Sequence, residues 1–399
     1  MPMPRIPHPN LLALPPLLRA GFRPFFLGGA LWALIVVALW VCALSGQLTL
    51  PTAFEPLAWH RHEMLFGYLG AVIAGFLMTA IPNWTGRLPI AGAPLAALSG
   101  LWLAARLALL FSATFGGLVA AVLDVGFLLV LAAVCAREVL AAKNRNLPIV
   151  AIVFLFALAN GLDHAEAAGL AVREGLGWRA GFALVLLLIS LVGGRIIPSF
   201  TRNWLAKQGL KHGLPQQPGN FDKAAIAVTA LALLGWTVVP DSSWTAALLL
   251  IAAASQAGRL ARWSGLRAIR DPLVFILHLG FAWLAIGLAL LGASAFYAGL
   301  PQTAGIHALA AGSMATMTLA VMTRATLGHT GRELRADGWT IAIYALVTAG
   351  AALRVAAPLL PLDYMRMIEI AGTLWGGAFL LFVLFYGPKL FGGRPDGRP

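Results

Sequence analysis

Long apolar runs recur along the whole chain and are separated by short polar segments. Each run is close to the roughly 20 residues that a helix needs to cross the hydrocarbon of a bilayer. The runs lie near 24–45, 60–81, 93–113, 116–137, 148–169, 180–201, 223–240, 243–262, 272–292, 303–324, 338–357 and 366–387. The pattern predicts an all-α polytopic membrane protein with about twelve transmembrane helices.

The composition supports this class. Hydrophobic residues make up 60% of the 399 positions and charged residues only 11%, with a mean hydropathy of +0.84, whereas ordinary soluble domains carry roughly 25% charged residues. A soluble globular fold is therefore excluded. We expect a cytoplasmic N-terminal arm at 1–23 and a single transmembrane domain at 24–399, whose longest connection is a cytoplasmic linker at 202–222.

The basic residues indicate the orientation of the chain. Its net charge of +13 would suggest nucleic acid as a partner in a soluble protein, but here most Lys and Arg lie at predicted helix ends. Nearly all of these fall on one side of the membrane, and the other side has Arg61, Arg173, Arg179 and Arg366. Because Lys and Arg concentrate in short cytoplasmic loops, we expect both termini in the cytoplasm and no nucleic-acid partner.

A short motif recurs where three of the predicted helices end on the cytoplasmic side. It reads IPNWT at 81–85, IPSFT at 197–201 and MTRAT at 322–326. Because four helices lie in each interval, the spacing favours three four-helix units, an arrangement similar to that of haem–copper oxidases. The alternative is that Pro and Thr are simply common at helix ends.

Ionisable side chains inside the apolar runs are the candidates for chemistry. Placing one such side chain in the membrane costs about 3 kcal/mol on insertion scales, so each is expected to have a partner or a functional role. The predicted topology places most of them in the periplasmic half, with His278 nearer the midplane and Arg195 in the run at 180–201. The periplasmic set comprises His60, His62, Glu63, Arg106, Asp124, Asp163, His164 and His307.

His60 and His62 are two residues apart, which is about 200° around a regular helix. Either His60 precedes the helix, or the two imidazoles face different neighbours. His60, Glu63 and Met64 share one face, and His307 and Met314 lie on one stripe of the run at 303–324. Imidazole and thioether groups suit iron and copper, so these faces can line a planar cofactor or a copper site.

Plainer interpretations remain open for each of these residues. A transmembrane histidine such as His164 or His278 often only makes a hydrogen bond between helices, and a methionine stripe is usually packing. Arg106 and Arg195 either pair with carboxylates or anchor a propionate. His329, just past the run at 303–324, lies in what reads as a solvated turn.

Five segments together resemble the NnrS family: 21–26 (GFRPFF), 59–67 (WHRHEMLFG), 75–86 (GFLMTAIPNWTG), 194–198 (GRIIP) and 322–332 (MTRATLGHTGR). Proteins similar to these are twelve-helix bacterial inner-membrane proteins that contain haem and copper. They are associated with denitrification and resistance to nitric oxide. The resemblance implies that His60, His62, His278, His307 and His329 are candidate metal ligands.

The resemblance implies haem and copper but not which histidine holds which metal. Because His62 and His307 both fall in the predicted periplasmic half, and small residues follow His307, we expect haem b between the second and tenth helices with these two as the axial pair. Arg106 and Arg195 are the candidate propionate anchors, and His60, His164 and His278 remain for copper. The expected function is binding of nitric oxide, followed by reduction or detoxification. If the protein is an oxidoreductase, Glu63 is the candidate catalytic acid.

Protons would reach that site from the periplasmic face through Glu63, Asp124, Asp163 and Glu166. Because the sequence has no CxxCH motif for covalent haem, the electron donor is expected to be a quinol or a small redox protein.

Two other classes compete with this prediction. A twelve-helix secondary transporter of a metal ion or small anion would use the same histidines and arginines, and it predicts two inverted repeats of six helices. A scaffold without a cofactor predicts that the histidines are replaceable. The intramembrane charge argues against the scaffold.

Overall fold

The computed structural model describes residues 11–397, and these form helices and no strands. The first ten residues of the predicted N-terminal arm lie outside the described part. All twelve predicted spans are helical. They are α1 (Phe22–Leu44), α2–η3–α3 (Pro56–Thr85), α4 (Ala93–Leu110), α6 (Gly117–Ala141), α7 (Leu147–Ala167), α8–η4–α9 (Leu176–Lys207), α10 (Asn220–Val238), α11 (Ser243–Ala261), α12 (Pro272–Ala293), α13–η6–α14 (Gln302–His329), α15 (Gly338–Ala356) and α16 (Tyr364–Phe391).

Eleven spans of the described chain are long and apolar enough to cross a membrane. The exception, α11, has Gln256 and Arg259 in its buried face, and these two side chains lower its hydropathy. Gln256 donates to Ser190 and Arg259 pairs with Asp222. The polar groups of α11 therefore point into the bundle, and the helix packs between α10 and α12. The chain is a polytopic helical membrane protein.

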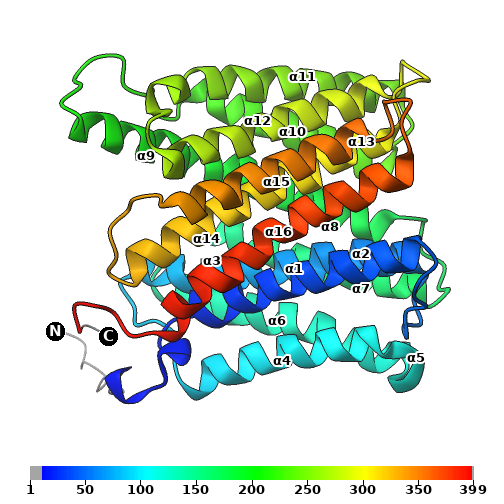
Figure 1. The fold of residues 1–399 in the computed structure, drawn as a ribbon, viewed down its shortest axis with the longest axis horizontal. Coiled ribbons are helices and arrows are strands. Elements are labelled where there is room, and N and C mark those ends of the chain that lie inside the picture. Colours follow the sequence, from blue (N-terminus) through cyan, green and yellow to red (C-terminus); the bar gives the residue numbers. More distant parts are fainter. Residues whose placement is uncertain (1–10, 398–399) are drawn as a thin grey trace.

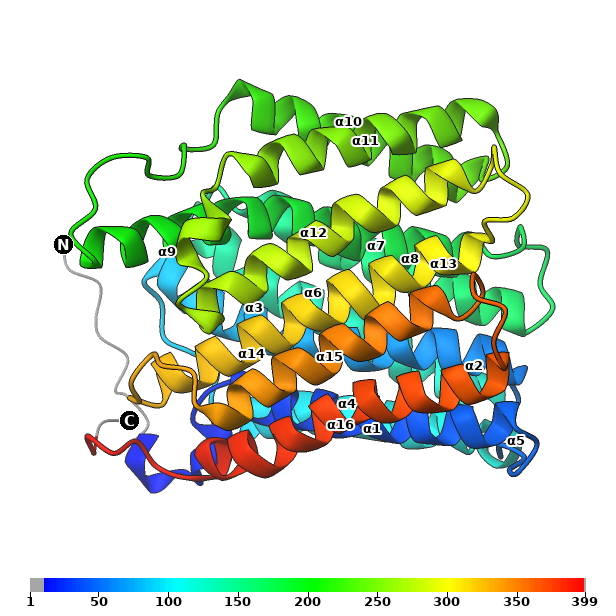
Figure 2. The same ribbon diagram turned by 45° about the horizontal axis from the view of Figure 1, so that its top comes forward.

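The twelve spans form one bundle (Figures 1 and 2) and divide along the chain into three consecutive groups of four. Within each group the second span carries a π-helical segment. The three groups close into a ring, because α6 packs on α7, α11 packs on α12, and α16 packs back on α1. The four-helix period predicted from the repeated motif matches this arrangement.

The three π-helical segments are η3 (Glu63–Tyr68), η4 (Ile189–Gly193) and η6 (Ala308–Met314). They occur in the second, sixth and tenth spans, which also carry the repeated motif. π-helical turns are rare and concentrate at functional sites, because the wider turn displaces the side chains that follow it. A functional site is therefore expected beside these three spans.

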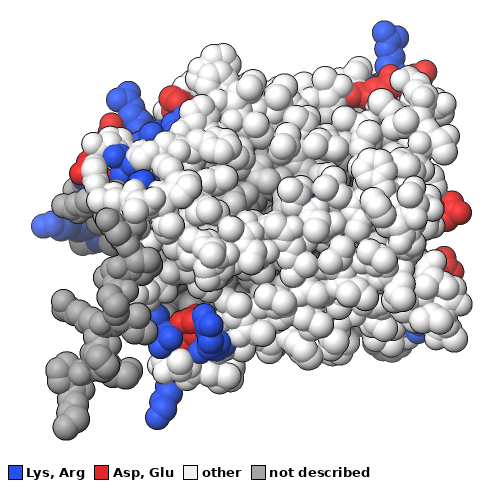
Figure 3. All heavy atoms as spheres, turned by 90° about the horizontal axis from the view of Figure 1, so that it is seen from below, with Lys and Arg blue, Asp and Glu red and all other residues white. Residues whose placement is uncertain are grey.

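Charge separates the two ends of the bundle from its middle. On the face shown in Figure 3, Lys and Arg gather mainly at one end and uncharged residues cover the broad middle. At the basic end, Arg23 of α1 is buried and donates to the carbonyls of Leu390 and Gly392, at 2.7 and 2.8 Å. This contact fastens the beginning of α1 to the end of α16.

Candidate metal centre

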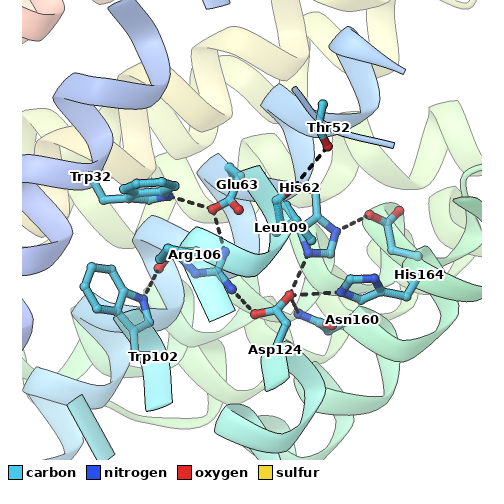
Figure 4. A network of polar contacts seen from close by, with 12 residues as sticks. Trp32, Thr52, His62, Glu63, Trp102, Arg106, Leu109, Asp124, Asn160 and His164 are labelled. Carbon is cyan, nitrogen blue, oxygen red and sulfur yellow. Dashed lines mark hydrogen bonds and ion pairs between the residues drawn. The ribbon is translucent and has the colours of Figure 1, made fainter. Parts of the chain in front are cut away.

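A buried ion network lies among α2, η3, α4, α6 and α7 (Figure 4). Arg106 of α4 pairs with both Glu63 and Asp124, and all three side chains are 0% exposed. Glu63 also accepts from the indole N–H of Trp32 at 2.6 Å. Buried charges of this kind are stable only when they are paired and hydrogen-bonded. Each charged group here has an ion-pair partner, and two buried atoms, Glu63 Oε1 and Arg106 Nε, have no hydrogen-bond partner.

His62 lies at the centre of the network, between two carboxylates. Its Nδ1 is 2.7 Å from Asp163 Oδ2 and its Nε2 is 2.7 Å from Asp124 Oδ2. Asp124 Oδ2 also contacts Asn160 Nδ2 at 2.8 Å and His164 Nε2 at 3.1 Å. The ligand atoms of His62, Asp124 and His164 lie within 4.8 Å of one another, so this buried group could hold a metal ion.

The local fold separates His62 from His60. Both belong to the last turn of α2 (Pro56–His62), and their side chains point in different directions, as the helical spacing requires. In the π-helical segment that follows, Glu63 points toward Arg106, whereas Met64 points away from the ion network. Gly67 makes this possible, since a Cβ at that position would lie 2.2 Å from Glu63 Oε2 and 2.5 Å from Arg106 Nη1.

His60 faces a second feature, which we call the histidine cavity. This cavity of about 310 Å³ lies between the second and tenth spans and is closed by α1, α8, α15 and α16. His60 and His307 both line it, together with Met64 and Met314. Its size and mostly apolar lining are typical of a small-molecule or cofactor site.

Several polar atoms around the histidine cavity are buried without a hydrogen-bond partner. They include His60 Nδ1, Arg61 Nε and Arg354 Nη1. His60 is held by stacking on Trp40, with ring centroids 4.8 Å apart. His307 Nδ1 lies 2.7 Å from the Thr303 carbonyl. An Nδ1–H that donates to this carbonyl leaves the Nε2 lone pair of His307 available to a ligand.

A third feature, the vestibule, is a cavity of about 690 Å³ at the ends of the central spans that carry the repeated motif. Arg145, Arg195, Arg324 and His329 line it. Arg195 donates to Asn146 at 3.1 Å, and the guanidinium of Arg324 lies over the ring of Phe200 at 4.2 Å. The vestibule therefore has a basic rim.

Asp271 caps α12 and interacts with Arg324 across this region. Burial raises the pKa of Asp271, and the charge of Arg324 opposes that shift. Its carboxylate accepts the N–H of Leu273 at 3.0 Å.

The predicted site residues fall into four places. The ion network contains His62, His164, Glu63 and Arg106. The histidine cavity contains His60 and His307, and the vestibule is lined by Arg195 and His329. His278 lies apart from all three, 2.8 Å from Thr201 Oγ1 and near the ring of Trp263. The structure thus brings His307 together with His60, whereas His62 is surrounded by carboxylates. Of the proton-relay candidates, Glu166 instead accepts two bonds from the backbone N–H of Gly175.

Arg354, which lines the histidine cavity from α15, was not among the predicted site residues. Arg61 was predicted only as a marker of topology. A polar side chain within the apolar run at 338–357 was the available signal for Arg354.

The fold and these sites define a polytopic helical membrane protein with a buried ion network and a cofactor-sized cavity flanked by two histidines. The chain belongs to the NnrS family: the family described as NnrS protein matches residues 16–394, nearly the whole sequence. This membership connects the chain with the nitric oxide response. No curated protein matches the sequence.

Proposed function

We propose that this protein binds haem b in the histidine cavity and uses it to bind nitric oxide, which it then reduces or detoxifies. The carrying observation is that His60 and His307 line one cavity between the second and tenth spans. We take His60 rather than His62 as the partner of His307. His62 does not line this cavity, and its two ring nitrogens face the carboxylate oxygens of Asp163 and Asp124 instead, at 2.7 Å.

The residues of the histidine cavity fit a haem. His60 and His307 would supply imidazole nitrogens to its iron. Arg61 Nε and Arg354 Nη1, which are buried without a hydrogen-bond partner, would suit its propionates. Ala310 and Ala311, whose side chains are small, form part of the wall against which a flat ring would lie. When bound, haem would supply an iron that takes up nitric oxide and exchanges electrons.

The ion network is the proposed source of protons for a reduction. Asp163 lies 3.9 Å from Arg61, which lines the histidine cavity, so the network and the cavity share a wall. Glu63 has one buried carboxylate oxygen, Oε1, without a hydrogen-bond partner, and it precedes the cavity residue Met64. We propose that Glu63 holds the proton nearest the haem, while electrons come from a separate quinol or redox protein.

Copper is proposed at the group formed by His62, Asp124 and His164. Two imidazoles and a carboxylate are ligands that copper accepts. Asn160 donates to the same carboxylate oxygen at 2.8 Å and would orient it. The test is the copper content of His164→Ala, which we expect to fall while the haem spectrum is kept; an unchanged copper content would contradict this site.

The rival proposal, transport of a metal ion or small anion, fits the arrangement less well. It predicts two inverted repeats of six helices, whereas the π-helical segments divide the bundle into three groups of four. Uptake of substrate by proteoliposomes of haem-free protein would favour the rival.

The deciding experiment is the reduced-minus-oxidised visible spectrum of the protein purified in detergent, with and without nitric oxide. We expect bands of a six-coordinate b-type haem that shift on addition of the gas. His60→Ala and His307→Ala should each lose these bands, whereas His212→Ala, in an exposed connection, should keep them. Full haem content in both cavity variants would refute the assignment.

A further inference from the structure

A third cavity lies at the middle of the bundle, between the histidine cavity and the vestibule. This central chamber has a volume of about 100 Å³, and its walls come mainly from α3, α8, η4 and α14. Thr318 is the one lining residue with a polar side chain. Its hydroxyl donates to the Ala315 carbonyl at 2.9 Å and contacts the Tyr68 hydroxyl. The chamber therefore offers water no free hydrogen-bonding group.

The central chamber adjoins both of the other cavities. Phe76, Val192 and Val321 line the chamber and the vestibule alike. Leu69 and Met314 line the chamber and the histidine cavity. The partitions thus consist of apolar side chains, and Leu and Met side chains change rotamer on short timescales. The three cavities therefore form a row, with the chamber between the other two.

Such a row discriminates by polarity. An apolar cavity of this size stays dry and takes up xenon or other small apolar molecules. A charged or strongly hydrated solute would lose its hydration in the chamber without replacement. Entry of an uncharged diatomic gas does not carry this desolvation cost.

We propose that the central chamber is a binding site for small apolar gases and a passage for nitric oxide between the vestibule and the histidine cavity. The passage rests on the proposed function, since it assumes that nitric oxide reacts in the histidine cavity. The gas-binding site does not depend on haem.

The binding site is tested with xenon. Crystals of the purified protein pressurised with xenon should show an anomalous peak among Phe76, Val192 and Val321. Val321→Phe and Val192→Phe should each remove that peak, because the added ring fills the chamber. Val130→Phe, at a position of α6 that is 44% exposed, should keep it. A wild-type protein without xenon in the chamber, or variants that retain the peak, would overturn the proposal.

The passage is tested by the rebinding of carbon monoxide to the reduced protein after flash photolysis. We expect the bimolecular rate to fall several-fold in Val321→Phe and Val192→Phe and to stay unchanged in Val130→Phe. Equal rates in all four proteins would overturn the passage. A xenon peak in a protein that binds no haem would confirm the gas site while refuting the proposed function, so the two failures are distinguishable.

Discussion

Arg106 provides the strongest test of the buried network. Replacing it by Leu leaves the carboxylates of Glu63 and Asp124 buried with one fewer cationic partner. Breaking a buried ion pair by removing one partner costs about 3–5 kcal/mol. Trp32 and Asn160 still donate to these carboxylates, so we expect about 3 kcal/mol, at the lower end of that range. The control is Arg87→Leu.

Arg87 pairs with Glu138 while its side chain is 41% exposed, and exposed pairs contribute about 0–1 kcal/mol. The measurement is the free energy of unfolding in one mixed-detergent system, with unfolding followed by tryptophan fluorescence. Adding Glu63→Gln to Arg106→Leu should recover part of the loss, because it removes a buried charge. If Arg106→Leu lowers the free energy of unfolding by no more than Arg87→Leu does, the ion pairs of Arg106 are not shielded from water and the prediction is refuted.

Three further outcomes are expected. Gly177→Ala should lower the free energy of unfolding by about 1–3 kcal/mol, because the added Cβ would lie 2.3 Å from a backbone nitrogen of α7. The control is Gly126→Ala, which has open space around the added Cβ and should be neutral or stabilising by up to about 1 kcal/mol. Arg23→Ala should expose the end of α16 to faster proteolysis, because two carbonyls lose a charged donor; unchanged cleavage would contradict the role of that contact. In a background without the two native cysteines, Lys211→Cys should react with impermeant maleimide only from the cytoplasm and Glu174→Cys only from outside, and the reverse pattern would refute the predicted orientation.

The spans could be predicted from sequence because length and hydropathy alone define them. All twelve runs form helices at the expected places. The ends were less accurate: the run at 180–201 continues as α9 to Lys207, which shortens the expected linker at 202–222 to residues 208–219. A polar, basic helix end outside the hydrocarbon has no hydropathy signal, so its length was hidden.

The site could be predicted only in part, because pairing between helices is not encoded in one helix. Sequence spacing left two alternatives: either His60 precedes the helix, or His60 and His62 face different neighbours. The structure places both residues in α2 with different neighbours. The spacing did not show which of them faces His307. The choice depends on Asp124 and Asp163, which come from α6 and α7 and occupy both nitrogens of His62.

The three π-helical segments explain why regular spacing fails at the same places where the cavities lie. Met64 in η3 and Ala311 in η6 line the histidine cavity, and Val192 in η4 lines the central chamber. A wider turn changes the face on which every later side chain lies, so a stripe counted at 3.6 residues per turn loses its register there. The other nine spans of the described chain carry no such segment. These regular helices can therefore stabilise the bundle, while the second, sixth and tenth spans depart from regular helix where they form cavity walls.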